Sequence, residues 1–153
     1  MATDQERGTE MATVRKFDRS MITTFLKGES LHYFTDSEGD FRIDFGADEE
    51  VKCDLTVWLL ISGEQDEMLS IMINSDKSVP RREQPRALLL CNQWNAENYW
   101  PRAYLNTEAS SIVLDRAFDF EKGVHQELLD DFIAGTIGAA MLFWQWAIDQ
   151  QGL

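Results

Sequence analysis

Few residues in this chain have the types and spacing that catalysis or metal binding requires. Zinc hydrolysis needs about three converging ligands. The chain has only two histidines, His32 and His125, and it has neither an HExxH nor a CxxC motif. It also has no glycine-rich phosphate loop and no G-x-S-x-G nucleophile motif. His125 stands where a helix should begin, which favours a capping role. We therefore predict no catalytic residues, no metal and no cofactor.

The two cysteines, Cys53 and Cys91, each lie in an apolar run. Buried thiols behave as small hydrophobic side chains, and two cysteines do not make a disulfide framework. A nucleophilic Cys91 would need nearby charge to lower its pKa, whereas the preceding residues 88–90 are all leucine. We expect two reduced, unreactive thiols in a cytoplasmic protein.

Acidic residues dominate the charge of the chain. Asp and Glu number 27 against 14 Lys and Arg, which gives a net charge of −13 and argues against nucleic-acid binding. The acidic cluster between residues 36 and 50 lacks the spacing of an EF-hand, and nothing in it selects a carboxylate pair for glycoside hydrolysis. We interpret this cluster as a solvated sheet edge that keeps strands of different molecules apart.

One short segment is basic. It contains Lys77, Arg81, Arg82 and Arg86, with Glu83 as its only acidic residue besides Asp76 at its border. Cations at the start of a helix oppose the helix dipole and cost a few tenths of a kcal/mol each. The segment is either a solvated loop or a site for an anionic partner, and in the second case Arg81, Arg82 and Arg86 are candidate binding residues.

A long helix is predicted over residues 125–149, and its stretch from Phe132 to Ile148 carries no charge. The stretch is at the lower limit for a membrane span, but acidic residues flank it, so we predict a buried helix and no membrane. Its apolar residues form two stripes, whereas a helix packed on one sheet needs only one. The second stripe needs a cover, which could be the first helix, a twin subunit or a bound peptide. Phe132, Phe143 and Trp146 are therefore candidate binding residues, and we expect a homodimer.

Two glycines interrupt this helix. Gly135 and Gly138 each cost about 1 kcal/mol relative to alanine in a helix interior. We interpret them as a place where another backbone comes close.

Hydrophobic periodicity predicts the other elements. The expected elements are a helix over 11–27, a hairpin over 31–45, strands over 52–61 and 68–73, a helix ending near 95, and strands over 102–107 and 111–118. Both faces of the strand over 52–61 are apolar, as in the centre of a sheet or a covered one. Since each strand-to-strand link is short, the sheet should be antiparallel. The prediction is an α+β fold, an antiparallel meandering sheet packed with helices, with the order α-β-β-β-β-α-β-β-α. Residues 11–150 should form a single domain behind a disordered leader at 1–10.

The segment CNQWNAENYWPRAYL at residues 91–105 resembles the YbjN family, which is described as bacterial sensory transduction regulators. The matching elements are Asn92-x-Trp94-Asn95, the strand start at 101–104 and the Gly123-Val124 step, with a weaker similarity over 11–148. The resemblance implies a fold like that of type III secretion chaperones, frequent dimers and no established catalytic residues. One departure is the sequence at 108–110, where relatives place an Asp-Gly turn, so we expect a longer loop there.

The polar residues of this segment have structural interpretations. Asn92 and Asn95 suit the end of a helix, where an amide can bind free carbonyls. Arg102 could stack on Trp94, Tyr99 or Trp100.

These observations favour a non-enzymatic, cytoplasmic protein-binding module that acts through an apolar surface and dimerisation. A chaperone-like or regulatory (signal transduction) role is what the resemblance implies. The partner would be a protein or peptide segment in an apolar groove or along a sheet edge. Two alternatives stay open. One is a small-ligand sensor with Trp58, Trp94 and Trp100 around a pocket, and the other is a small enzyme that uses an Arg/carboxylate site near Arg102 or the basic segment.

Overall fold

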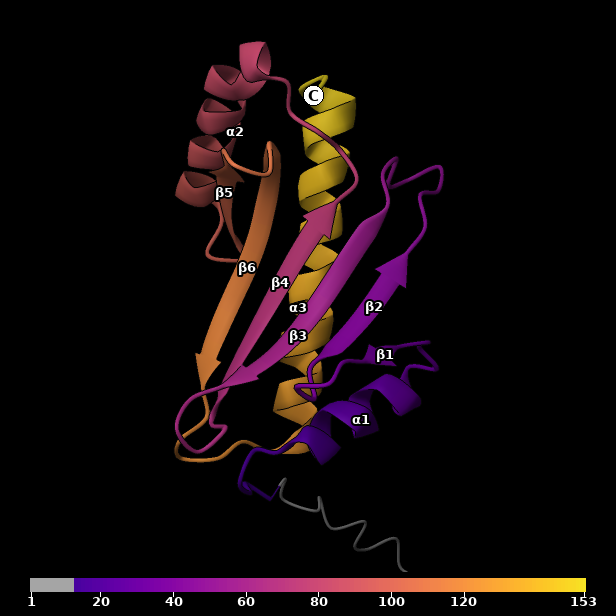
Figure 1. The fold of residues 1–153 in the computed structure, drawn as a ribbon, viewed down its shortest axis with the longest axis vertical. Helices are drawn as coiled ribbons and strands as arrows, with labels where there is room; N and C mark the ends of the chain where they lie inside the picture. The colour runs from indigo at the N-terminus through magenta and orange to yellow at the C-terminus, as the bar shows by residue number, and fades with distance from the viewer. Residues whose placement is uncertain (1–12) are drawn as a thin grey trace, which may run out of the picture.

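The computed structural model describes residues 13–153 as a six-stranded antiparallel sheet with a long helix along one face (Figure 1). The strands are β1 (Phe34–Thr35), β2 (Phe41–Phe45), β3 (Leu55–Ser62), β4 (Met68–Ser75), β5 (Arg102–Asn106) and β6 (Ser111–Asp119). The helices are α1 (Arg19–Gly28), α2 (Gln84–Glu97) and α3 (Gln126–Gln145), with a 3-10 turn η1 (Arg81–Glu83) before α2 and a π-helical turn η2 (Trp146–Gln150) after α3. The α+β class and the order of the elements agree with the prediction. The leader predicted at residues 1–10 lies outside the described residues.

The strands lie in the spatial order β1-β2-β3-β4-β6-β5, and every neighbouring pair is antiparallel. The first four strands follow one another as hairpins. After β4 the chain passes through α2 and forms β5 at the outer edge, and β6 then returns between β5 and β4. The sheet therefore departs from a simple meander at this one crossover.

The first helix begins later than predicted. α1 starts at Arg19 because the carboxylate of Asp18 caps it, accepting a hydrogen bond from the Met21 backbone N–H at 3.2 Å. Residues 13–18, which precede it in the described part of the chain, are not helical. Arg15 forms a β-bridge with Val124, with backbone hydrogen bonds of 3.2 and 2.9 Å in the two directions. The start predicted at residue 11 was therefore wrong.

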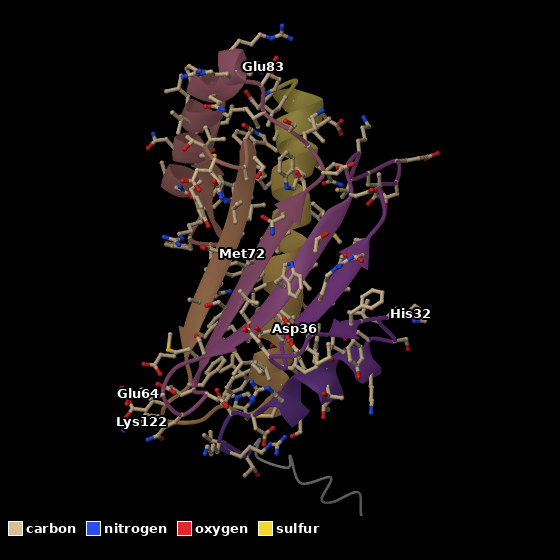
Figure 2. All side chains as sticks on the ribbon, viewed as in Figure 1. His32, Asp36, Glu64, Met72, Glu83 and Lys122 are labelled. Atoms are coloured by element: carbon tan, nitrogen blue, oxygen red, sulfur yellow. The ribbon has the colours of Figure 1, made fainter. Side chains whose placement is uncertain are left out.

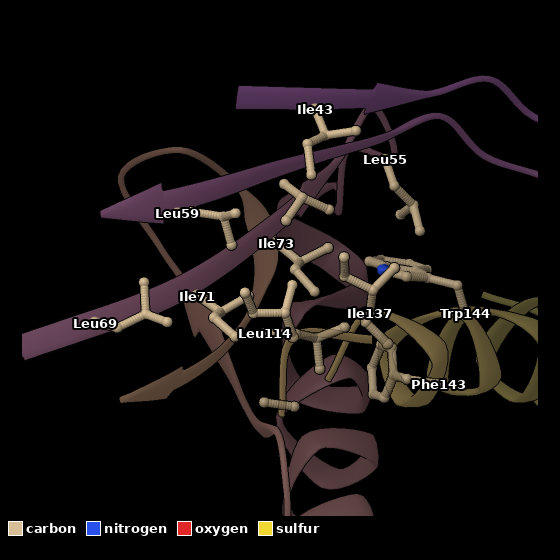
Figure 3. Close-up of a cluster of buried hydrophobic side chains, with 14 of the residues drawn as sticks. Ile43, Leu55, Leu59, Leu69, Ile71, Ile73, Leu114, Ile137, Phe143 and Trp144 are labelled. Carbon is tan, nitrogen blue, oxygen red and sulfur yellow. The ribbon is translucent and has the colours of Figure 1, made fainter. Parts of the chain in front are cut away.

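The core lies between the sheet and α3. Alternate residues of the central strands point toward the helix and are fully buried there, among them Leu59, Ile71 and Ile73 (Figure 3). By length and hydropathy, the helix from Gln126 to Gln150 could cross a membrane. In this fold it lies against the sheet, and Ile133 is among its fully buried residues, so α3 is the core helix of the domain.

The other face of the sheet has no helix over it in the part of the chain that the structure describes (Figure 1). Met72 lies on this face (Figure 2) and is half-buried. Trp58, directly opposite it in the register, and Leu60 lie on the same face and are half-buried. β3 and β4 are central strands, as their apolar faces predicted. Their second face is open, and this leaves apolar surface available beside the core.

Candidate functional site

The C-terminal end of the second apolar stripe of α3 packs against Trp94 of α2 in the same chain. The Trp94 ring meets the ring of Phe143 edge-on, with centroids 5.3 Å apart, and the ring of Trp146 at 6.1 Å. Phe143 is 0% exposed and Trp146 is half-buried. The Trp94 indole N–H donates to the Pro101 carbonyl at 2.9 Å, which ties α2 to the start of β5. Phe143 therefore cannot touch a partner while the subunit stays folded.

Phe132 lies in a separate aromatic cluster nearer the start of α3. Its ring stacks on Phe118 at 4.5 Å and on Phe120 at 6.2 Å, and the side chain is half-buried. The three aromatic candidates thus divide between two clusters along the helix.

The three arginine candidates are exposed around the start of α2. Arg81, Arg82 and Arg86 form no ion pair with any residue from 13 to 153. Arg86 lies beside Gly152, just after the last turn of the α3–η2 helix. A cation is favourable at a helix C-terminus, and Arg86 lies near this one, whereas no described residue lies in an ion pair with Arg81 or Arg82.

Apolar side chains remain exposed around a groove of about 490 Å³ on α3, which we call the α3 groove. Its lining residues are Trp94, Glu97, Asn98, Tyr99, Trp100, Gly135, Gly138, Ala139 and Leu142. Tyr99 is fully exposed, and Leu142 is 60% exposed. The groove therefore presents aromatic and aliphatic surface that residues 13–153 leave uncovered.

The two helix glycines have different surroundings. A Cβ on Gly135 would lie 3.7 Å from the Trp100 ring, which is an ordinary van der Waals contact, and no described backbone comes close to either glycine, so their interpretation as a close backbone approach was wrong. A Cβ on Gly138 would meet no described atom within 4 Å. Gly138 therefore exposes helix backbone on the floor of the α3 groove.

A second cleft of about 510 Å³ lies on the open face of the sheet, and we call it the sheet cleft. It is lined by Leu60, Ser70, Met72, Tyr99, Trp100, Arg102, Asp115, Arg116 and Ala117. Tyr99 and Trp100 line both clefts, so the two lie on either side of this aromatic pair.

Arg102 is an ion-pair partner and does not stack where the sequence suggested. Its Nη2 donates to Asp115 Oδ2 at 2.9 Å, and this pairing raises the pKa of the Arg102 guanidinium. Its guanidinium carbon lies 5.2 Å from the centre of the Tyr104 ring. The prediction of stacking on Trp94, Tyr99 or Trp100 was wrong, because Arg102 pairs with Asp115, the residue opposite it in the register of β5 and β6.

Sequence reasoning missed Arg116. This residue stacks on Trp100, with the guanidinium carbon 4.2 Å from the ring centre. The alternation of Ile112, Leu114 and Phe118 in the same strand could have placed it, since residues two apart share one face of a strand.

The three tryptophans of the sensor alternative do not share one pocket, whereas Arg102 and Asp115, near which the enzyme alternative was placed, lie together as an ion pair in the sheet cleft. Trp94 and Trp100 share the α3 groove, but Trp58 lies on the opposite face of the sheet beside Arg42 and Met72. His32 is exposed. His125 caps α3 as expected, with its Nδ1 accepting from the Leu128 backbone N–H at 3.0 Å.

One group of carboxylates comes close together in the described part of the chain. It consists of Asp36, Glu38 and Asp40 in the turn between β1 and β2. Asp36 Oδ1 accepts hydrogen bonds from the backbone N–H groups of Glu38 and Asp40, and Asp40 Oδ1 accepts from the Ile61 N–H, each at 2.9 Å. These carboxylates order the turn, so we assign no metal to them.

Both cysteine thiols are predicted to resist alkylation in the folded protein. Burial raises the pKa of Cys53 and of Cys91 to about 11, so at pH 8 the reactive thiolate is scarce. We expect iodoacetamide to label the native protein more slowly than the urea-unfolded protein, by a factor on the order of a hundred. Mass spectrometry of timed samples measures this, and rapid labelling of native Cys91 would contradict it.

The comparisons with known proteins agree with this architecture. Residues 18–148 match the model of the YbjN family, described as "Putative bacterial sensory transduction regulator". The solved structure "Crystal structure of YbjN, a putative transcription regulator from E. coli" is similar with a TM-score of 0.68 at 13% identity, covering 91% of this chain and 96% of that one. "Structure of the HopA1-SchA Chaperone-Effector Complex" has a TM-score of 0.50 at 15% identity, covering 83% and 94%. No curated protein matches the chain.

Proposed function

Because the chain belongs to the YbjN family, we propose that it is a non-enzymatic protein-binding module with a chaperone-like or regulatory role, working as a homodimer in the cytoplasm. The family description supports a regulatory role. The similarity in fold to a chain of a chaperone–effector complex supports a protein partner. The paired Arg102–Asp115 and the buried thiols support a role without catalysis.

The observation that carries this proposal is the α3 groove. Leu142 and Tyr99 are exposed beside the bare helix backbone at Gly138. Covering one leucine side chain contributes roughly 1.5–3 kcal/mol, so a short apolar segment could bind here by covering this surface. A helix or an extended segment lying over Gly138 would use a known mode of peptide recognition.

The variant Leu142→Glu tests this proposal, with Leu89→Glu as the matched control. Both leucines are exposed on helices, at 60% and 71%, but only Leu142 lines the α3 groove. We expect Leu142→Glu to weaken partner binding at least tenfold, because a charge in the groove must be desolvated when an apolar segment binds. The measurement is affinity purification from the native cell with quantitative mass spectrometry, comparing each variant with the wild type.

Equal recovery of the same proteins by the wild type and both variants would exclude the α3 groove. Sedimentation velocity on the purified wild type tests the dimer separately, and a monomer at all concentrations would contradict that part of the proposal. Circular dichroism melts confirm that each variant remains folded.

A further inference from the structure

Arg116 is a charged residue on the core side of the sheet. In the register of β6 with β4 it lies opposite Ile71, and it shares a face with the buried Leu114 and the half-buried Phe118. This face packs toward α3. The position would ordinarily hold an apolar side chain, so the arginine calls for a physical explanation.

The guanidinium of Arg116 lies among aromatic rings. Its central carbon is 4.2 Å from the centre of the Trp100 ring, 4.5 Å from that of Phe118 and 5.2 Å from that of Phe132. This partial burial removes water from the cation and lowers the pKa of Arg116. The rings stabilise the charge through their faces but accept no conventional hydrogen bond from its edge.

The edge of this guanidinium has no polar partner among residues 13–153. Arg19, Arg42 and Arg102 each donate to a carboxylate, whereas Arg116 forms neither a hydrogen bond nor an ion pair there. A guanidinium carries five N–H donors arranged to match a carboxylate. Arg116 is thus held in place by the rings, with its donors unused.

A partner can reach Arg116 from outside. β5 pairs with β6 only as far as Asp115, so no described strand lies beside residues 116–119 on the side away from β4. Arg116 also lines the sheet cleft, and Trp100, which stacks on it, lines the α3 groove. From Gly135 beneath Trp100 to Leu142, the helix rises about 10 Å.

We infer that Arg116 binds a carboxylate side chain of the partner protein, so that the partner segment must carry an acidic residue at a fixed spacing from its apolar anchor in the α3 groove. This inference rests on the proposed function, because the same segment occupies the groove. The unpaired guanidinium supplies the charge complementarity. The competing explanation is that Arg116 only protects the sheet edge, since an inward-pointing charge can prevent strands of other molecules from pairing with it.

Peptide selection tests the inference. A library of random peptides displayed on phage is incubated with each immobilised protein, and the bound phage are recovered. The proteins are the wild type, Arg116→Met, Arg116→Lys, Leu142→Glu and the control Arg42→Met. Methionine keeps an apolar stem against the rings and removes the charge, while lysine keeps the charge. Arg42 is the matched control because it lies over the Phe34 ring but is paired with Asp44. Circular dichroism melts verify folding.

We expect the wild type and Arg42→Met to select peptides with Asp or Glu at a fixed spacing from an aliphatic residue, and Arg116→Met to lose that preference. A selected peptide containing glutamate should bind Arg116→Met about tenfold more weakly than the wild type, and its glutamine analogue should bind both equally. Arg116→Lys should bind the glutamate peptide with an affinity between those of the wild type and Arg116→Met.

Two results would overturn the inference. Peptides that depend on Leu142 but show no acidic preference would leave the proposed function standing and exclude Arg116 as the carboxylate site. The absence of any peptide that depends on Leu142 or on Arg116 would overturn both.

Discussion

Phe143→Ala is expected to lower the free energy of unfolding by about 3–5 kcal/mol. The ring is 0% exposed and meets Trp94 edge-on at 5.3 Å and Trp144 at 5.2 Å. Removing it leaves a cavity where α2 meets α3 and the rings can close only part of it. Urea denaturation followed by tryptophan fluorescence measures the loss.

Leu142→Ala is the control for this variant. Leu142 is the adjacent residue but is 60% exposed, so we expect its loss to change the free energy of unfolding by no more than about 0.5 kcal/mol. A small effect of Phe143→Ala, or equal effects of the two variants, would show that α2 does not close over α3 as described.

Trp94→Ala is expected to lower the free energy of unfolding by a similar amount, about 3–5 kcal/mol. It should also destabilise α2 and β5 more than the rest of the sheet. Trp94 packs on Phe143 and Trp146, and its indole N–H binds the Pro101 carbonyl at the start of β5. Without it, α2 and β5 lose their main connection to α3. Hydrogen exchange should therefore accelerate in α2 and β5 far more than in β3.

The exposed neighbour Gln93 provides the matched control, since Gln93→Ala changes the same helix without touching the core. If hydrogen exchange in Trp94→Ala were equally faster in all strands, Trp94 would have no selective role in holding α2 and β5. Because Trp94 and Phe143 are in contact, the double variant should lose less stability than the two single losses combined.

Local pattern was sufficient to predict most of the fold. The alternation around Val57 and Ile71 gave central strands, and the uncharged stretch of α3 gave a buried helix. The predicted start of α1 was wrong because Val14 and Phe17 have helical spacing although Arg15 forms a β-bridge with Val124. That bridge joins segments remote in sequence, so no local pattern contains it.

The polar contacts of the candidate site were harder to predict for the same reason. Asn95 was expected to bind helix carbonyls, but its side chain binds both backbone groups of Ala103 in β5, at 2.8 and 2.9 Å. Asn98 caps the helix instead, donating to the Trp94 carbonyl at 3.0 Å. The prediction for Asn92 and Asn95 was therefore wrong, because α2 continues to Glu97 and β5 passes beside Asn95.

The cover of α3 shows what amphipathic pattern can and cannot decide. Two apolar stripes correctly indicated that α3 needs a second surface. They could not distinguish α2 from a twin subunit, because any apolar surface satisfies the same requirement. Trp94 covers Phe143 and Trp146, while Leu142 remains exposed beside them.

The crossover between β4 and β6 has a consequence for the order of folding. The strands from β1 to β4 pair through short loops, whereas the pairing of β6 with β4 closes a loop of residues 76–110. Closing that long loop costs more chain entropy and slows assembly. The half of the sheet that carries Arg116 should therefore be the last to form, so the newly made chain acquires the surface proposed to bind a partner only when folding is complete.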